Sequence, residues 1–162
     1  MDLIHQTAKH LLDIHFGGNW TTTNLKDVLS DVSWEEATAK IDEFNTIAVL
    51  TFHTTYYIDA LVDVLQGKAL TSKDELSFLC PKISSESDWQ SIQNSAWDNV
   101  KKAASLIEGF SDEKLKKDFT DEKYGSYYRN IHGMIEHMHY HLGQIVILKR
   151  LIKKTNSKHG NK

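Results

Sequence analysis

The chain has 162 residues, which is long enough for one domain with a substantial core, and its 40% hydrophobic and 25% charged residues are typical of a globular protein. A net charge of −3 gives no general attraction to nucleic acid or to an anionic membrane, so neither is an expected partner. No apolar run approaches the roughly 20 residues that span a bilayer. The single cysteine, Cys80, cannot form an internal disulfide, and no secretory signal is recognisable, so a cytoplasmic location is expected.

The first part of the chain predicts three helices. The first is expected over Leu3–Phe16 and ends at a pair of glycines; Asn24 then caps a short helix with the sequence LKDVLSDV. Ser33 and Glu36 form the capping-box pattern, in which each side chain bonds the backbone N–H of the other residue. This pattern predicts the start of the longest helix, Trp34 to about Gln66, in which apolar residues recur at helical spacing.

The second part of the chain predicts two further long helices. A connection of about twenty residues follows Gly67 and holds at most one helical turn. Ser87 and Gln90 form another capping-box pattern, which predicts a helix over Asp88–Glu108. After a brief helical turn, the final helix is expected over Asn130–Lys154.

The number and length of these helices predict the fold class. Four main helices with short accessory helices form an all-α four-helix bundle, here a single domain over residues 1–154 with a flexible C-terminal tail over residues 155–162. Consecutive helices that run parallel need a connection as long as the bundle. The connection between the second and third main helices is long enough for such a crossover.

Three histidines are the strongest indication of chemistry in the sequence. His137 and His141 are four residues apart and therefore share one face of the final helix, in the middle of its apolar stripe. His53 lies centrally on the apolar stripe of another helix. A buried imidazole needs a polar partner, and one metal ion would satisfy all three. The alternative is that each of them bonds a carbonyl or hydroxyl group in the core.

Other residues near this cluster have weaker support. Gln144, one turn after His141, could orient a ligand or a bound water, and Tyr57 could present its hydroxyl to the same cavity. His139 lies on the opposite side of its helix and is expected to be exposed or to support the ligands. No residue can be assigned as a general base, because Glu136 directly precedes His137 and so points elsewhere.

The pattern HxxxHxGQ, formed by His137, His141, Gly143 and Gln144, together with the earlier His53, resembles the DinB-like superfamily. This group includes YfiT-like metal-dependent hydrolases and thiol-dependent transferases. The resemblance implies an up-down-down-up bundle, often a homodimer, and one divalent metal ion, zinc or nickel. It implies hydrolysis, or transfer of a low-molecular-weight thiol such as bacillithiol or mycothiol, with a small electrophile as substrate.

A second class of function is compatible with the same residues. The metal could be structural, and the bundle could serve as a binding or dimerisation module in a stress response without catalysing a reaction. The two classes differ in what chelation does, because a structural metal contributes directly to the free energy of folding.

Overall fold

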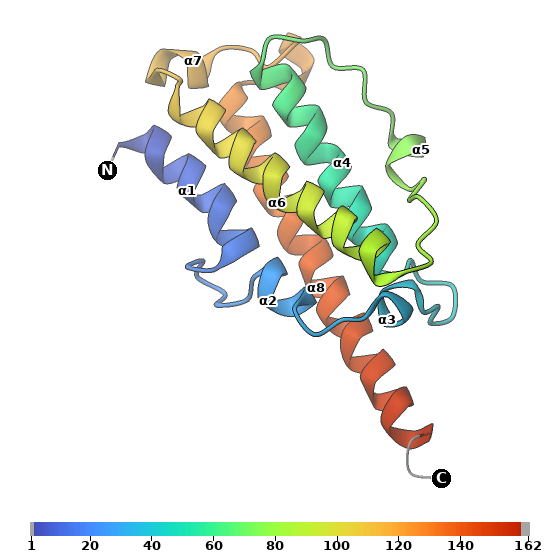
Figure 1. The fold of residues 1–162 in the computed structure, drawn as a ribbon. Helices are drawn as coiled ribbons and strands as arrows, with labels where there is room; N and C mark the ends of the chain where they lie inside the picture. Colours follow the sequence, from blue (N-terminus) through green and yellow to red (C-terminus); the bar gives the residue numbers. More distant parts are fainter. Residues whose placement is uncertain (1, 160–162) are drawn as a thin grey trace.

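The computed structural model describes residues 2–159, and its architecture is a bundle of four long helices (Figure 1). These helices are α1 (Leu3–Phe16), α4 (Ile47–Leu65), α6 (Glu86–Glu108) and α8 (Tyr127–His159). Helix α1 packs on α6 and α8, and α4 packs on the same two helices. Each long helix therefore has two long neighbours, which is the arrangement that a four-helix bundle requires.

Short helices lie in the connections between the long ones. They are α2 (Leu25–Leu29), α3 (Trp34–Thr38), α5 (Asp74–Ser77), α7 (Asp112–Lys116) and the 3-10 helix η1 (Glu122–Tyr124). Within the described residues the only β-type pairing is an isolated bridge between Asp118 and Ser126. The prediction of an all-α bundle with short accessory helices is confirmed.

The direction of the helices follows the expected topology. Figure 1 shows α1 and α8 running one way and α4 and α6 running the other way. The parallel pair α4 and α6 is joined by the long connection that contains α5, which passes along the outside of the bundle (Figure 1). The crossover brings α5 into contact with α4.

The predicted single helix from Trp34 to Gln66 is wrong. Ala39 leaves the helical region with ψ 130°, and Asp42 adopts a positive φ of 44°, so the helix stops and a loop follows. Thr46 then caps α4 by accepting a hydrogen bond from the N–H of Val49 at 3.2 Å. The segment KIDEFNT contains neither glycine nor proline, but its aspartate, asparagine and threonine have side chains that compete for backbone hydrogen bonds. Phe44, which would lie inside the predicted helix, is 61% exposed in this loop.

Two other helix boundaries also differ from the predictions. Helix α6 begins two residues earlier than expected, because Ser85 caps it by accepting from the N–H of Asp88, so the proposed box at Ser87 is wrong. Helix α8 has 33 residues, beginning at Tyr127 and continuing to His159. Residues 160–162 of the expected flexible tail lie outside the described residues.

The core is formed by the facing sides of the long helices and by the α2–α3 segment. Trp89 of α6 is fully buried, and its indole N–H donates to the carbonyl oxygen of Val32 at 2.9 Å. The largest fully buried side chains besides Trp89 come from both the long and the short helices: Leu11, Ile14, Leu25, Leu29, Ile47, Ile58, Leu61, Ile107, Leu115, Ile131 and Met138. The short helices therefore complete the core that positions α4 and α8.

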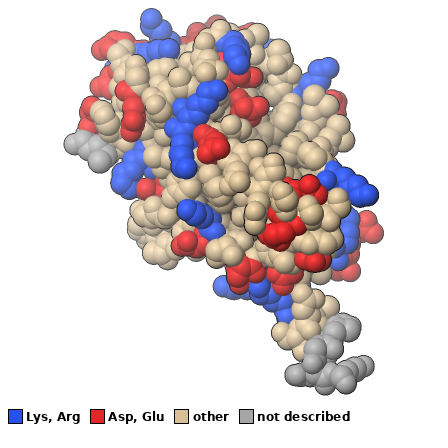
Figure 2. Space-filling view, in the orientation of Figure 1, with Lys and Arg blue, Asp and Glu red and all other residues tan. Residues whose placement is uncertain are grey.

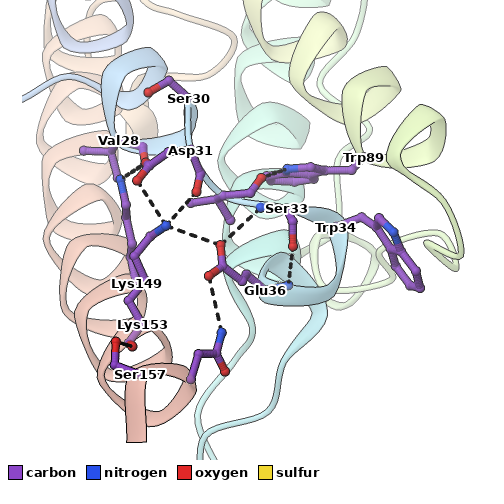
Figure 3. A network of polar contacts seen from close by, with 12 residues as sticks. Val28, Ser30, Asp31, Ser33, Trp34, Glu36, Trp89, Lys149, Lys153 and Ser157 are labelled. Carbon is purple, nitrogen blue, oxygen red and sulfur yellow. Dashed lines mark hydrogen bonds and ion pairs between the residues drawn. The ribbon is translucent and has the colours of Figure 1, made fainter. Parts of the chain in front are cut away.

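Lysine side chains of α8 fasten the α2–α3 segment to the bundle (Figure 3). Lys149 donates to the carbonyl oxygen of Val28 at 2.7 Å and to the carboxylate of Asp31. Lys153 lies 3.1 Å from the Asp31 carboxylate and 3.6 Å from that of Glu36. These groups are partly exposed, so the contacts fix the position of the segment more than they stabilise the fold.

Positive and negative side chains are interspersed on the face of the molecule shown in Figure 2. No helix within residues 2–159 combines the length and the apolar character needed to cross a membrane.

Candidate metal centre

The fold brings His53, His137 and His141 together at the contact between α4 and α8. His53 is 3% exposed and His141 is 7% exposed, while His137 is half-buried. One ring nitrogen from each residue lies within 4.8 Å of the other two. This is the only such group of three potential ligands among the residues that the structure describes. The buried triad could therefore hold a metal ion.

The short helix α5 fixes the ring of His53. The Ser77 hydroxyl donates to the carbonyl oxygen of Asp74 at 2.6 Å, so its oxygen is left to accept a hydrogen bond from Nδ1–H of His53 at 2.8 Å. With its proton on Nδ1, the neutral ring of His53 presents a lone pair on Nε2. The crossover connection thus sets the protonation of a histidine that lies 24 residues earlier in the chain.

A side chain one turn further along α8 fixes the ring of His141 in the same way. The amide oxygen of Gln144 lies 2.7 Å from Nδ1 of His141 and accepts the Nδ1–H hydrogen. Nε2 of His141 therefore also carries a lone pair. Gln144 thus contacts one of the expected ligands, and its role in orienting that ligand stays a prediction.

Both fixed lone pairs are directed at the third imidazole. Nε2 of His53 lies 3.0 Å from Nε2 of His137, and Nε2 of His141 lies 2.9 Å from the same atom. One ring nitrogen carries at most one hydrogen, so His137 can donate to only one of the two neighbours. In the other contact the lone pair of the neighbour faces Nε2 of His137 at about 3 Å with no hydrogen between them, which is unfavourable unless a cation lies there.

The chemistry and spacing of these donors fit a divalent metal ion. Imidazole nitrogens bind zinc at about 2.0–2.1 Å in a tetrahedral arrangement, so three such nitrogens lie roughly 3.3 Å apart. The two short contacts of 2.9 and 3.0 Å are close to that separation. Metal-bound histidines also bond a polar group through their second nitrogen, as His53 and His141 do. Zinc, nickel, copper and iron all accept imidazole ligands.

The electrostatics of the site keep the three imidazoles neutral. Burial lowers the pKa of each ring below its usual value of 6.5, because burial disfavours the charged form. For His137 the pKa falls to about 4, since His141 and His53 add repulsion to the effect of burial. Neutral rings offer their lone pairs at neutral pH without competition from protons.

Aromatic side chains surround the triad. Phe78 stacks on the ring of His53 with centroids 4.2 Å apart, and Tyr57 meets the rings of His53 and His137 edge-on, each at 5.1 Å. The Tyr57 hydroxyl donates to the carboxylate of Asp74 at 2.6 Å. Burial and this bond raise the pKa of Tyr57 to about 12, so it stays a neutral phenol. The hydroxyl points to Asp74, while the ring shields the imidazoles from water.

A cleft of about 550 Å³ opens beside the triad. Its wall contains His137 but neither of the other two histidines, and it also includes Tyr57, Gly133 and Met134. This volume lies within the range of about 300–1,000 Å³ that small-molecule sites usually have. A small molecule can therefore reach the cluster from the side of His137.

Sequence reasoning missed the contribution of the crossover connection. Asp74, Ser77 and Phe78 all contact the site, yet nothing in their local sequence marks them, because their role depends on how the connection docks on α4. His139 lies outside the cluster; it is half-buried, and its Nε2 is buried without a hydrogen-bond partner. Burial raises the pKa of Cys80 to about 11, so its thiol stays protonated and is a poor nucleophile.

No protein-family model, no curated protein and no solved structure matches this chain.

Proposed function

We propose that the protein is a divalent-metal-dependent enzyme of the DinB-like type, a hydrolase or a transferase of a low-molecular-weight thiol, with a small electrophile as substrate. The observation that carries this proposal is the convergence of two fixed lone pairs on His137 at the end of an open cleft. A structural metal is typically enclosed by four protein ligands, whereas a catalytic metal keeps a position for water or substrate. The cluster has three potential ligands within the described residues, which would leave such a position open.

The residues of the site fall into groups with different roles in this proposal. His53, His137 and His141 hold the metal, which supplies Lewis acidity and lowers the pKa of a bound water or thiol to near neutral. Ser77 and Gln144 keep two of these rings in the required tautomer. Tyr57 and Phe78 exclude water from the ring faces, and the cleft positions the substrate.

Elemental analysis of the purified protein tests the proposal. We expect near-stoichiometric divalent metal in the untagged wild type and its loss from His53→Ala, His137→Ala and His141→Ala. His10→Ala is the matched control, because His10 is an exposed histidine of α1 outside the cluster, and this variant should keep the metal. If the wild type contains no metal and takes up neither zinc nor nickel, the proposal is wrong. Metal-loaded protein would then be screened for thiol transfer and hydrolysis.

An exposed apolar surface favours a second candidate, a non-enzymatic module that forms a homodimer. One groove beside the C-terminal half of α8 is lined by Phe44, Ile147 and Leu151, which are 61%, 60% and 41% exposed. Exposed apolar groups gathered in this way favour a contact with another protein. Sedimentation of the wild type and of Ile147→Asp would test the dimer. If chelation also sharply lowers the unfolding temperature, the metal is structural and the module is the better description.

A further inference from the structure

The wall of the cleft beside the triad carries only one sign of formal charge. It contains Lys123 and Arg129 but neither aspartate nor glutamate. The ammonium group of Lys123 lies 3.8 Å from the exposed carboxylate of Asp121, which offsets part of its charge. The guanidinium of Arg129 forms no ion pair with any described residue. A positively charged group in a ligand-sized cleft is thus left without an anion.

The guanidinium of Arg129 lies along α8 in the direction of the triad. Arg129, Gly133 and His137 are four residues apart in turn and share one face of the helix. Nη1 of Arg129 lies 3.3 Å from the point that a Cβ atom on Gly133 would occupy. The missing side chain at Gly133 leaves the space in which the guanidinium lies. From Gly133 to His137 the helix rises about 6 Å. One small molecule is therefore long enough to contact both the guanidinium and the triad.

The backbone around Arg129 favours the same sign of ligand charge. Arg129 is in the first turn of α8, where the helix dipole adds positive potential. The Arg129 N–H already donates to the Ser126 hydroxyl at 3.2 Å, and the side-chain amide of Asn130 donates to carbonyl oxygens of Tyr124 and Ser126, each at 2.9 Å. These donors are occupied within the protein. Among these groups of Arg129 and Asn130, the guanidinium is the one that remains to bind an anion.

We propose that the molecule that binds this cleft carries a carboxylate or a similar oxyanion, which Arg129 binds while the reacting end of the same molecule lies at the triad. This inference rests on the proposed metal-dependent function and adds the charge of the substrate to it. A planar guanidinium binds a carboxylate through two parallel hydrogen bonds, so it fixes orientation as well as charge. Neutral molecules of the same size gain no such contact.

A matched pair of thiols tests the inference on cobalt-loaded protein. 3-Mercaptopropionate and 3-mercaptopropionamide have nearly the same shape and differ in the negative charge. Their binding is followed by the absorbance that a thiolate produces when it coordinates cobalt. For each protein we take the ratio of the Kd of the amide to the Kd of the acid. We expect this ratio to be about fivefold to tenfold larger in the wild type than in Arg129→Met. Comparing the two proteins cancels the intrinsic difference between the thiols.

The chain offers one matched control, because Arg150 is its only other arginine. Arg150 is exposed on the same helix but lies outside the cleft wall, so Arg150→Met should retain the wild-type preference for the acid. If the wild type and Arg129→Met show the same acid-to-amide ratio, or if Arg150→Met loses as much as Arg129→Met, the inference is overturned.

A second measurement separates this inference from the proposed function. Succinate, a dicarboxylate without a thiol, is titrated into metal-free protein while the NMR signals of the Arg129 side chain and the Gly133 amide are observed. If the protein takes up no metal, the proposed function fails, and this titration alone decides the inference. Shifts confined to the cleft and lost in Arg129→Met would support the anion site. If the metal-free protein shows no such shifts at high succinate concentration, the inferred anion site is overturned.

Discussion

Replacing Ser77 by alanine tests whether α5 prepares His53 for metal binding. The Ser77 oxygen accepts the Nδ1 hydrogen of His53 at 2.8 Å, and this bond fixes the lone pair on Nε2. Ser77 forms no hydrogen bond with His137 or His141, and its own hydroxyl donates to the carbonyl oxygen of Asp74 at 2.6 Å. The variant removes one oxygen atom and leaves the three imidazoles in place. Any change in metal affinity therefore reports on the orientation and protonation of His53.

The structure gives the size of the expected effect. The loss of one neutral hydrogen bond costs about 1 kcal/mol, and the free ring of His53 also gains a second tautomer that cannot bind metal through Nε2. A loss of about 1.4 kcal/mol corresponds to a tenfold weaker affinity, the lower end of the about 10–100-fold range for groups that orient metal ligands. Gln144→Ala should have a similar effect through His141.

The assay is a competition for zinc at pH 7 between the protein and a coloured chelator. Ser95→Ala is the matched control, because the exposed Ser95 hydroxyl donates to the carbonyl oxygen of Ser91 within α6, a helix that contributes no residue to the triad. Thermal unfolding of the metal-free proteins shows whether the variants remain folded. A zinc affinity of Ser77→Ala within about twofold of the control would refute the reasoning.

Three further predictions concern the fold. Burial lowers the pKa of His15 to about 4, so the unfolded chain takes up a proton on this ring at higher pH than the folded chain does. The free energy of unfolding of the wild type, relative to that of His15→Asn, should therefore fall by about 3 kcal/mol from pH 7 to pH 4. Urea unfolding at each pH measures this difference. Trp89→Leu should destabilise the protein by about 3 kcal/mol in the same assay, because it leaves a cavity and removes the donor to Val32; a loss below about 1 kcal/mol would contradict the burial of this indole. Lys149→Met, which removes the partly exposed pair with Asp31, should cost less than about 1 kcal/mol in urea and weaken the dependence of stability on salt.

The local sequence determined most of the helices. Leu3–Phe16 was predicted with its observed bounds, and the caps at Asn24 and Ser33 were recognised because a capping residue acts on backbone groups two or three positions away. The break before Thr46 was missed, because its cause is a set of weak preferences in residues 39–46 with no glycine or proline among them. Such preferences decide the backbone only when packing supports them.

The sequence by itself also determined the three histidines of the candidate site. The spacing of His137 and His141 places them on one helix face, and the apolar stripe around His53 turns it toward the same core. Gln144 could be proposed for the same reason, since its contact with His141 spans less than one turn of a single helix. The helical periodicity of the sequence is sufficient to predict a contact wherever the two interacting groups share one helix.

Only the tertiary structure decided how these histidines are held and what reaches them. Ser77 meets His53 because the crossover between α4 and α6 docks on the outside of the bundle, and Arg129 faces the cleft because α8 begins beside η1 and the end of α4. These contacts join segments whose separation in sequence bears no relation to helical periodicity. They follow from the packing of the whole bundle, which no local pattern of residues encodes.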